Sequence, residues 1–296
     1  MKNKNISVLV FAPVSFIGLV ARAWRQLEFT YYCGQSVRKA ITVFFAASVT
    51  IAGASAMQPS QAQAAQVVSP NANASSEGNS ANGFPFSISD FALSSQRYQQ
   101  VYNAAEFSSI TSPMVITQIA FRPNALGAAA FSSTLPSIQI DMSTTSAAAD
   151  TMNATFGSNV GANDTVVFPQ GPLSLSSAFT GPAAGPKDFD IVINFTTPFL
   201  YNPSAGNLLL DVRNFGGGST TQFDAQNLNG DGSSRDYSDI DSNVGGASGT
   251  LTSFALVTRF TFTPVPEPSA GILLMVGGFL LAAFRERSRL MAFRWR

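Results

Sequence analysis

Histidine is absent from this 296-residue chain, and it has only one cysteine, Cys33, and two tryptophans. Without histidine the chain cannot form a Ser-His-Asp or Cys-His catalytic arrangement, a histidine-ligated metal site or a histidine acid-base pair. A single cysteine excludes a disulfide framework. Charged residues make up 11% of the chain, less than half of the about 25% found in average globular proteins. These absences exclude many classes of catalytic mechanism and favour an exported structural or binding protein.

Positive charge is scarce in the middle of the chain, although the formal net charge of the whole is zero. Residues 65–266 contain six cations and fourteen anions, a net charge of −8, whereas both terminal segments are basic. An acidic body repels the phosphate backbone of nucleic acids. We therefore expect no nucleic-acid partner.

The N-terminal segment 1–64 has the features of a secretory signal peptide. The basic pair Arg38-Lys39 precedes an apolar run over residues 40–52, which is short for a membrane-spanning helix. Small residues then offer two A-x-A cleavage sites, and we expect cleavage after Ala64, with Ala56 as the alternative. The sequence thus predicts export across the inner membrane.

Nearly forty residues precede that basic pair, which is unusual for a signal peptide. Two interpretations stay open. Either the signal is extended and includes the additional apolar stretch 6–20, or translation starts near Val37. In both cases Cys33 is lost from the mature protein, which then contains no cysteine.

The C-terminal segment 264–296 combines three features in a fixed order. A proline-rich spacer contains Pro266-Glu267-Pro268, an apolar run over residues 270–284 follows, and a basic cluster comes next, with the cations Arg285, Arg287 and Arg289. The run predicts a short transmembrane helix, and the arginines place its end in the cytoplasm. The alternative is an ordinary C-terminal anchor that is not processed.

This order of features resembles the sorting signal of PEP-CTERM proteins. Pro266, Glu267 and Pro268 match the signature tripeptide, residues 270–284 match its helix, and the three arginines match its basic cluster. The resemblance covers about the last thirty residues, and Leu290–Arg296 extends beyond the pattern. It implies processing by an exosortase, a membrane-embedded enzyme, in bacteria that make extracellular polysaccharide.

The body over residues 84–263 alternates apolar and polar residues with a period of two. Examples are Ile138/Ile140/Met142, Phe189/Ile191/Ile193/Phe195 and Leu208/Leu210/Val212, and turn signals rich in Gly, Pro and Asn separate such runs. One buried face per strand is typical of antiparallel sheets. We therefore predict an all-β fold, a single antiparallel β-sandwich or jelly-roll-like domain. Residues 65–83 are rich in Asn, Ser, Ala and Gly, and predict a flexible linker.

Two groups of residues in the body are candidates for ligand contact. Tyr98 and Tyr102 lie at strand spacing on one face, where they would either contact a sugar or pack in the core. Asn227, Asn229 and Asp231 provide oxygen ligands at every second position, like the start of a calcium loop, but Ser238 stands where a bidentate Glu is needed. A polar loop without calcium is the alternative. We expect no other cofactor.

Taken together, these features favour a non-enzymatic exported protein that is anchored in the inner membrane as a precursor and then sorted to the cell surface or the extracellular matrix. An exosortase-like enzyme and the membrane are its expected partners, with exopolysaccharide in a biofilm as a further one. The alternative is a carbohydrate-binding, lectin-like module. A secreted glycosidase is a third hypothesis, but it needs a pair of carboxylates, and Asp188 and Asp190 are also explained as outward charges on a half-exposed strand.

Overall fold

The computed structural model describes residues 64–239, 243–265 and 277–279. Within these residues the chain is almost entirely β-structure, with helix confined to short 3₁₀ turns and to residues 277–279, so the predicted all-β class is confirmed. The strands are β1 (Ala65–Ser69), β2 (Ser80–Asn82), β3 (Gln96–Tyr102), β4 (Met114–Phe121), β5 (Phe131–Thr145), β6 (Thr165–Ser177), β7 (Ile191–Tyr201), β8 (Asn207–Asn214), β9 (Phe223–Asn227), β10 (Ser233–Tyr237), β11 (Thr250–Thr252), β12 (Phe254–Leu256) and β13 (Thr258–Pro264). The 3₁₀ turns are η1 (Asn71–Asn73), η2 (Ile88–Phe91), η3 (Ala104–Phe107), η4 (Phe156–Asn159) and η5 (Pro203–Ala205).

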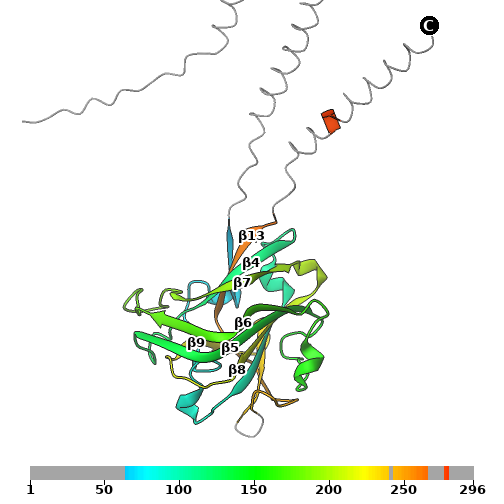
Figure 1. Cartoon of the computed structure of the whole chain (residues 1–296). Helices are drawn as coiled ribbons and strands as arrows, with labels where there is room; N and C mark the ends of the chain where they lie inside the picture. Colours follow the sequence, from blue (N-terminus) through cyan, green and yellow to red (C-terminus); the bar gives the residue numbers. More distant parts are fainter. Residues whose placement is uncertain (1–63, 240–242, 266–276, 280–296) are drawn as a thin grey trace, which may run out of the picture. The chain divides into compact units, whose positions relative to one another are not determined.

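The strands form three antiparallel sheets (Figure 1). One sheet has the order β1-β13-β4-β7, a second has the order β11-β10-β3-β8-β5-β6, and a small third one has the order β12-β9-β2. Most hydrogen-bonded neighbours are distant in sequence, so the chain repeatedly crosses from one sheet to another. The β7–β8 connection is one such crossing, and there the Tyr201 hydroxyl donates to the Gly206 carbonyl oxygen over 3.0 Å.

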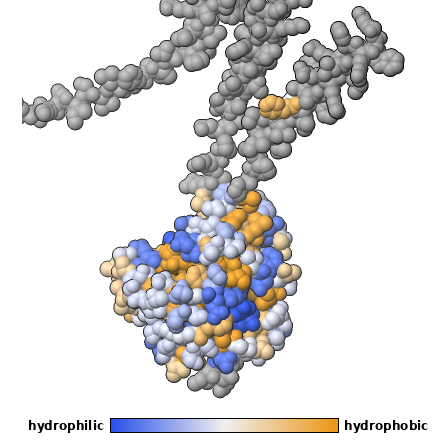
Figure 2. All heavy atoms as spheres, in the orientation of Figure 1, coloured by the Kyte–Doolittle hydropathy of each residue, from blue (hydrophilic) through white to orange (hydrophobic). Residues whose placement is uncertain are grey.

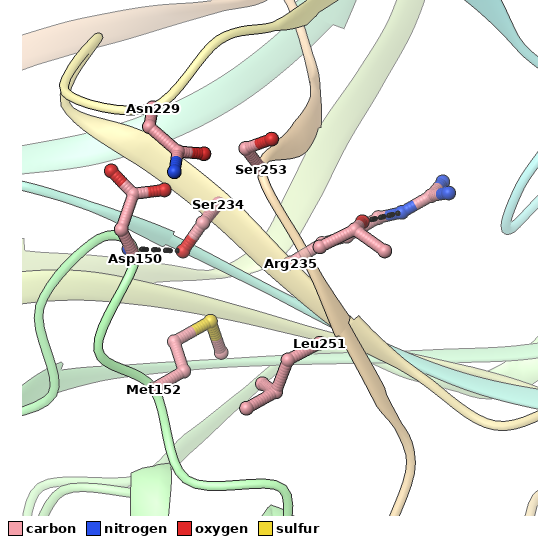
Figure 3. Close-up of a pocket in the computed structure, with 8 residues that line it drawn as sticks. Asp150, Met152, Asn229, Ser234, Arg235, Leu251 and Ser253 are labelled. Atoms are coloured by element: carbon pink, nitrogen blue, oxygen red, sulfur yellow. Dashed lines mark hydrogen bonds between the residues drawn. The ribbon is translucent and has the colours of Figure 1, made fainter.

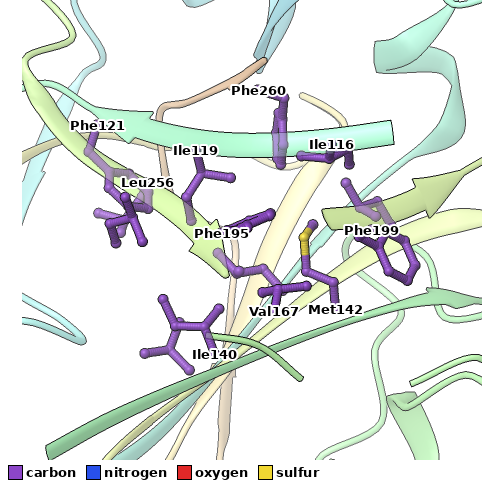
Figure 4. Close-up of a cluster of buried hydrophobic side chains, with 14 of the residues drawn as sticks. Ile116, Ile119, Phe121, Ile140, Met142, Val167, Phe195, Phe199, Leu256 and Phe260 are labelled. Carbon is purple, nitrogen blue, oxygen red and sulfur yellow. The ribbon is translucent and has the colours of Figure 1, made fainter. Parts of the chain in front are cut away.

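The core lies between the four-stranded and six-stranded sheets. Figure 4 shows side chains of both sheets meeting there, among them Ile140 and Met142 of β5 and Ile116 and Phe260 of β4 and β13. The ring of Tyr102 in β3 also meets that of Phe260 edge to face, with centroids 4.9 Å apart. This face-to-face packing is β-sandwich-like, and it buries the apolar positions that the period-two pattern predicted in β5 and β7.

Strand β8 is buried on both faces, whereas its alternating sequence predicts one exposed face. Leu208, Leu210 and Val212 point into the core as expected, but Leu209 is also only 1% exposed. The reason is the connection between β5 and β6, which places Met152 against Leu209 on the outer face of the six-stranded sheet. A long-range contact of this kind leaves no trace in the local periodicity.

The flexible linker predicted over residues 65–83 is wrong, because this segment contains β1, η1 and β2. Strand β1 pairs with β13, and β2 pairs with β9. Between them, the guanidinium of Arg122 donates to the carbonyl oxygens of Asn73 and Ser76 over 3.0 and 2.6 Å, and a carboxylate oxygen of Asp224 accepts from the Gly78 N–H. These partners lie far along the chain, so the polar composition of the segment did not reveal that it is ordered.

The β1–β13 pairing brings the two ends of this domain together. Ala65 lies opposite Phe262, and the two strands run side by side in Figure 1. Figure 2 shows hydrophobic and hydrophilic areas mixed on one face of the domain. Exposed apolar residues are ordinary on protein surfaces, so the composition of that face does not by itself identify a binding site.

Candidate ligand-binding cavity

A cavity of about 170 Å³ lies beside β10, where three separate parts of the chain meet. Its lining consists of Asp150, Met152, Asn229, Ser234, Arg235, Leu251, Thr252 and Ser253. Figure 3 shows the polar ends of Asp150, Asn229 and Ser253 on one side and the apolar side chains of Met152 and Leu251 on the other. One water molecule needs about 10–15 Å³ of such space, so the cavity can hold a group considerably larger than a water molecule.

Asp150 is held in place from two sides. Its backbone N–H donates to the Ser234 hydroxyl over 2.9 Å, and its carboxylate oxygen Oδ2 accepts from the Gly230 N–H over 2.7 Å. Its φ of 62° is left-handed, a conformation that Asp tolerates better than most residues. The carboxylate is therefore fixed at the cavity through Oδ2, and its other oxygen, Oδ1, accepts no hydrogen bond from the described residues.

The three residues predicted to bind calcium have separate roles in the structure. Asn227 pairs with Phe254, and its side-chain oxygen accepts from the Ser253 hydroxyl over 2.8 Å. Asn229 lines the cavity, whereas Asp231 accepts from the N–H of Ser233 over 2.9 Å. Within the described part of the chain, no three or more acidic, cysteine or histidine side chains are grouped so that they could hold a metal ion. Calcium binding here stays a prediction without structural support.

The pKa of Asp231 is raised to about 6, mainly by burial. The nearby carboxylates of Asp150 and Glu106 add to this rise. Negative charge is therefore concentrated on this side of β10.

Tyr98 and Tyr102 do share a face, but it is the core face, and both side chains have 0% exposure. The Tyr98 hydroxyl donates to the Gln100 side-chain oxygen over 2.6 Å, and the Tyr102 hydroxyl shares a hydrogen bond with that of Thr258 over 2.8 Å. Of the two roles that the sequence left open, packing in the core is therefore the one the structure supports, and contact with a ligand is not. Burial raises the pKa of Tyr98 to about 12.

A row of polar side chains crosses the outer face of the six-stranded sheet. Asp236 of β10, Gln99 of β3, Asp211 of β8 and Asp141 of β5 occupy neighbouring register positions. All four are almost fully buried, although outward carboxylates are expected to meet water. Within the described residues, no hydrogen bond of good geometry reaches either carboxylate oxygen of Asp236, although the nearby Tyr237 backbone N–H favours its ionised form. Burial raises the pKa of Asp236 to about 7.

Two arginines compensate the other carboxylates of this row. Arg97 forms a paired contact with Asp211, in which Nε lies 3.1 Å from Oδ1 and Nη2 lies 2.5 Å from Oδ2. Arg213 lies 3.2 Å from a carboxylate oxygen of Asp141. Asp236 therefore differs from its neighbours, because it is buried without an ion pair of its own.

Arg235 lines the cavity, but Figure 3 shows its guanidinium turned away from Asp150 and Asn229. That group lies 4.5 Å from the ring centroid of Tyr237 and 4.7 Å from that of Phe254. Such cation–π contacts stabilise a buried cation. Its positive charge is therefore directed at aromatic rings rather than into the cavity.

Of the cavity residues, the sequence pattern singled out Asn229 alone. Asp150, Met152 and Leu251 are spread over about a hundred positions, and no motif connects them. The left-handed backbone at Asp150 has no sequence signature beyond the residue type itself. They come together because the β5–β6 connection, which carries Asp150 and Met152, lies against β10, and β10 pairs with β11, which carries Leu251.

Most of the residues predicted to direct export, sorting and membrane insertion lie outside the described part of the chain. These are Ala56, Pro266, Glu267, Pro268, Arg285, Arg287 and Arg289, together with all but residues 277–279 of the predicted transmembrane helix. Among the residues that are described, no helix is both long and apolar enough to cross a bilayer. Ala64 is described, and it is an exposed residue directly before β1.

No protein-family model matches the chain, and no curated protein sequence matches it significantly.

Proposed function

We propose that this protein is a non-enzymatic component of the cell surface or extracellular matrix, exported by its N-terminal segment and sorted through its C-terminal tail by an exosortase-type enzyme. In this proposal the body is a sandwich of the jelly-roll kind. It is held at the inner membrane as a precursor, then processed and placed among exopolysaccharide, as in a biofilm.

The pairing of β1 with β13 is the observation that best supports this proposal. Ala64, the expected cleavage position, directly precedes β1, and β13 ends at Pro264, two residues before the tripeptide that begins at Pro266. Both terminal segments therefore join the domain at neighbouring points. The described strands all lie between Ala65 and Pro264, so removal of residues 1–64 and of the chain beyond the proline-rich spacer would keep every described sheet.

A binding role fits the site better than a hydrolytic one. Glycoside hydrolysis requires two carboxyl groups at a defined separation, and the lining of the described cavity contains one carboxylate, that of Asp150. Asp190, one of the pair considered from the sequence, accepts hydrogen bonds from the Ser177 hydroxyl and the Ala178 N–H. Its role is thus to hold a loop. In the lectin-like alternative, Tyr98 and Tyr102 cannot contact a sugar because they are buried, and the cavity beside β10 is the candidate binding site instead.

Replacing Glu267 by Ala tests the sorting proposal. The variant keeps the apolar run and the arginines, so we expect insertion to persist and processing to fail, with unprocessed protein accumulating in the membrane fraction. Glu286→Ala, which removes the carboxylate beyond the apolar run, is the matched control and should be processed normally. If the Glu267→Ala protein is trimmed and released as fast as the wild type, the tail is merely an anchor.

A further inference from the structure

We propose that the cavity beside β10 binds a single pyranose unit of a neutral or amino-sugar glycan. This inference rests on the proposed function, because it names the chemical class of the matrix partner that the exported domain would hold.

The lining of the cavity has the same two-sided character as a sugar ring. A pyranose presents hydroxyl groups around its rim and apolar C–H groups on its faces. The Asp150 carboxylate and the exposed Asn229 amide can bind hydroxyls, while the 43% exposed Leu251 can pack against the C–H face beside the largely buried Met152. The volume of about 170 Å³ suits one ring.

Asp150 is already fixed before any ligand arrives. Its N–H and its Oδ2 are both engaged, by Ser234 and Gly230, so binding costs little side-chain ordering. Its left-handed φ of 62° is a sparsely populated conformation for a residue other than glycine, and such conformations cluster at ligand sites. These fixed contacts leave Oδ1 as an acceptor for a hydroxyl or an ammonium group.

The charges around the cavity select among sugars. Asp150 carries the negative charge of the lining. The carboxylate of Asp231 lies close enough to interact electrostatically with those of Asp150 and Glu106. The guanidinium of Arg235 is turned toward aromatic rings. An anionic sugar would meet this negative potential without a compensating cation. Uronic acids and sulfated or phosphorylated sugars are therefore disfavoured, whereas neutral sugars and amino sugars are accepted.

A glycan array tests this inference with the full-length protein in detergent micelles. The array carries neutral, amino-sugar, uronic-acid and sulfated oligosaccharides. We expect retention on neutral or amino-sugar glycans and competition by the corresponding free monosaccharide. Asp150→Asn should weaken binding about tenfold, because it replaces a charged acceptor with a neutral amide whose hydrogen bonds are weaker. Asn229→Ala should weaken binding about tenfold or more, because it removes a hydrogen-bonding group from the ligand.

Asp188→Asn is the matched control, since Asp188 is an exposed carboxylate away from the cavity lining, and it should bind like the wild type. Circular dichroism and thermal unfolding verify that each variant is folded. Three results would each overturn the inference: no retention on any glycan, retention on acidic glycans alone, or unchanged binding by folded Asp150→Asn and Asn229→Ala proteins. None of these results affects the sorting proposal, which is tested by processing and localisation.

Discussion

Replacing Asp236 by Asn should stabilise the protein at neutral pH. The Asp236 carboxylate is fully buried, and no hydrogen bond of good geometry reaches either oxygen from the described residues. It faces Gln99 across the ladder, with Gly249 and the ring of Phe156 packed close by. The nearest charges are those of Arg97, which is paired with Asp211, and of Asp211 itself. An ionised carboxylate in this place is stabilised by the Tyr237 backbone N–H and by the shared charge of Arg97, but it forms no described ion pair of its own.

The size of the expected gain in the free energy of unfolding follows from the raised pKa of Asp236. Burial raises the pKa of Asp236 from the ordinary value of 3.8 to about 7 in the folded protein. The folded state therefore holds a proton between about pH 4 and pH 7 that the unfolded chain has released, so the contribution of Asp236 to stability falls as the pH rises through this window. At about 1.4 kcal/mol per pKa unit, its charge costs up to about 4 kcal/mol at pH 8.

Denaturant unfolding of the wild type and Asp236→Asn between pH 3.5 and 8 measures this difference. We expect equal stability near pH 3.5 and a gain for Asn that grows to between about 2 and 4 kcal/mol at pH 8. Asp224 and Asp231 also have a raised pKa of about 6, but they are present in both proteins, so their effects cancel in the comparison. Parallel stability profiles, or a destabilised Asn variant at pH 8, would refute the reasoning.

Two further predictions concern the packing. Arg122→Ala should lower the free energy of unfolding by about 3–5 kcal/mol, as measured by denaturant titration, because it leaves the buried carboxylate of Asp224 without its partner at 2.7 Å; a loss below 1 kcal/mol would contradict this role. Gly161→Ala should strongly destabilise the fold because a Cβ there would lie 1.8 Å from the Thr144 carbonyl oxygen, whereas Gly157→Ala meets no atom within 4 Å and should leave the melting temperature almost unchanged. Equal melting temperatures for the two glycine variants would contradict the close approach.

The strands that alternate in sequence were predictable, since one buried face per strand is a local property. The alternation of Ile191 and Ile193 with polar residues in β7 placed both side chains in the core correctly. In β8 the same pattern failed for Asp211, because the long β5–β6 connection covers the outer face of the sheet. The segment 65–83 failed for a similar reason, since β1 finds its partner β13 about two hundred residues later.

The candidate site was less predictable than the fold. Asn229 drew attention because it belongs to a run of oxygen-bearing side chains, but that run predicted a metal site rather than the wall of a cavity. Leu251 and Met152 are ordinary apolar residues in the sequence, and they share a cavity only because the β5–β6 connection lies against β10, the neighbour of β11. The tyrosines show the converse, because their shared face was correctly deduced but it points inward.

The intact mass of the extracellular form tests the central claim most directly, because it defines both ends of the mature chain at once. We predict a species that begins at Ala65, the first residue of β1, and ends in the proline-rich spacer before the apolar run at 270–284, with every described strand retained. A protein found only inside the cell, or an extracellular protein that still carries residues 1–64 or 270–296, would contradict export and sorting by these two segments.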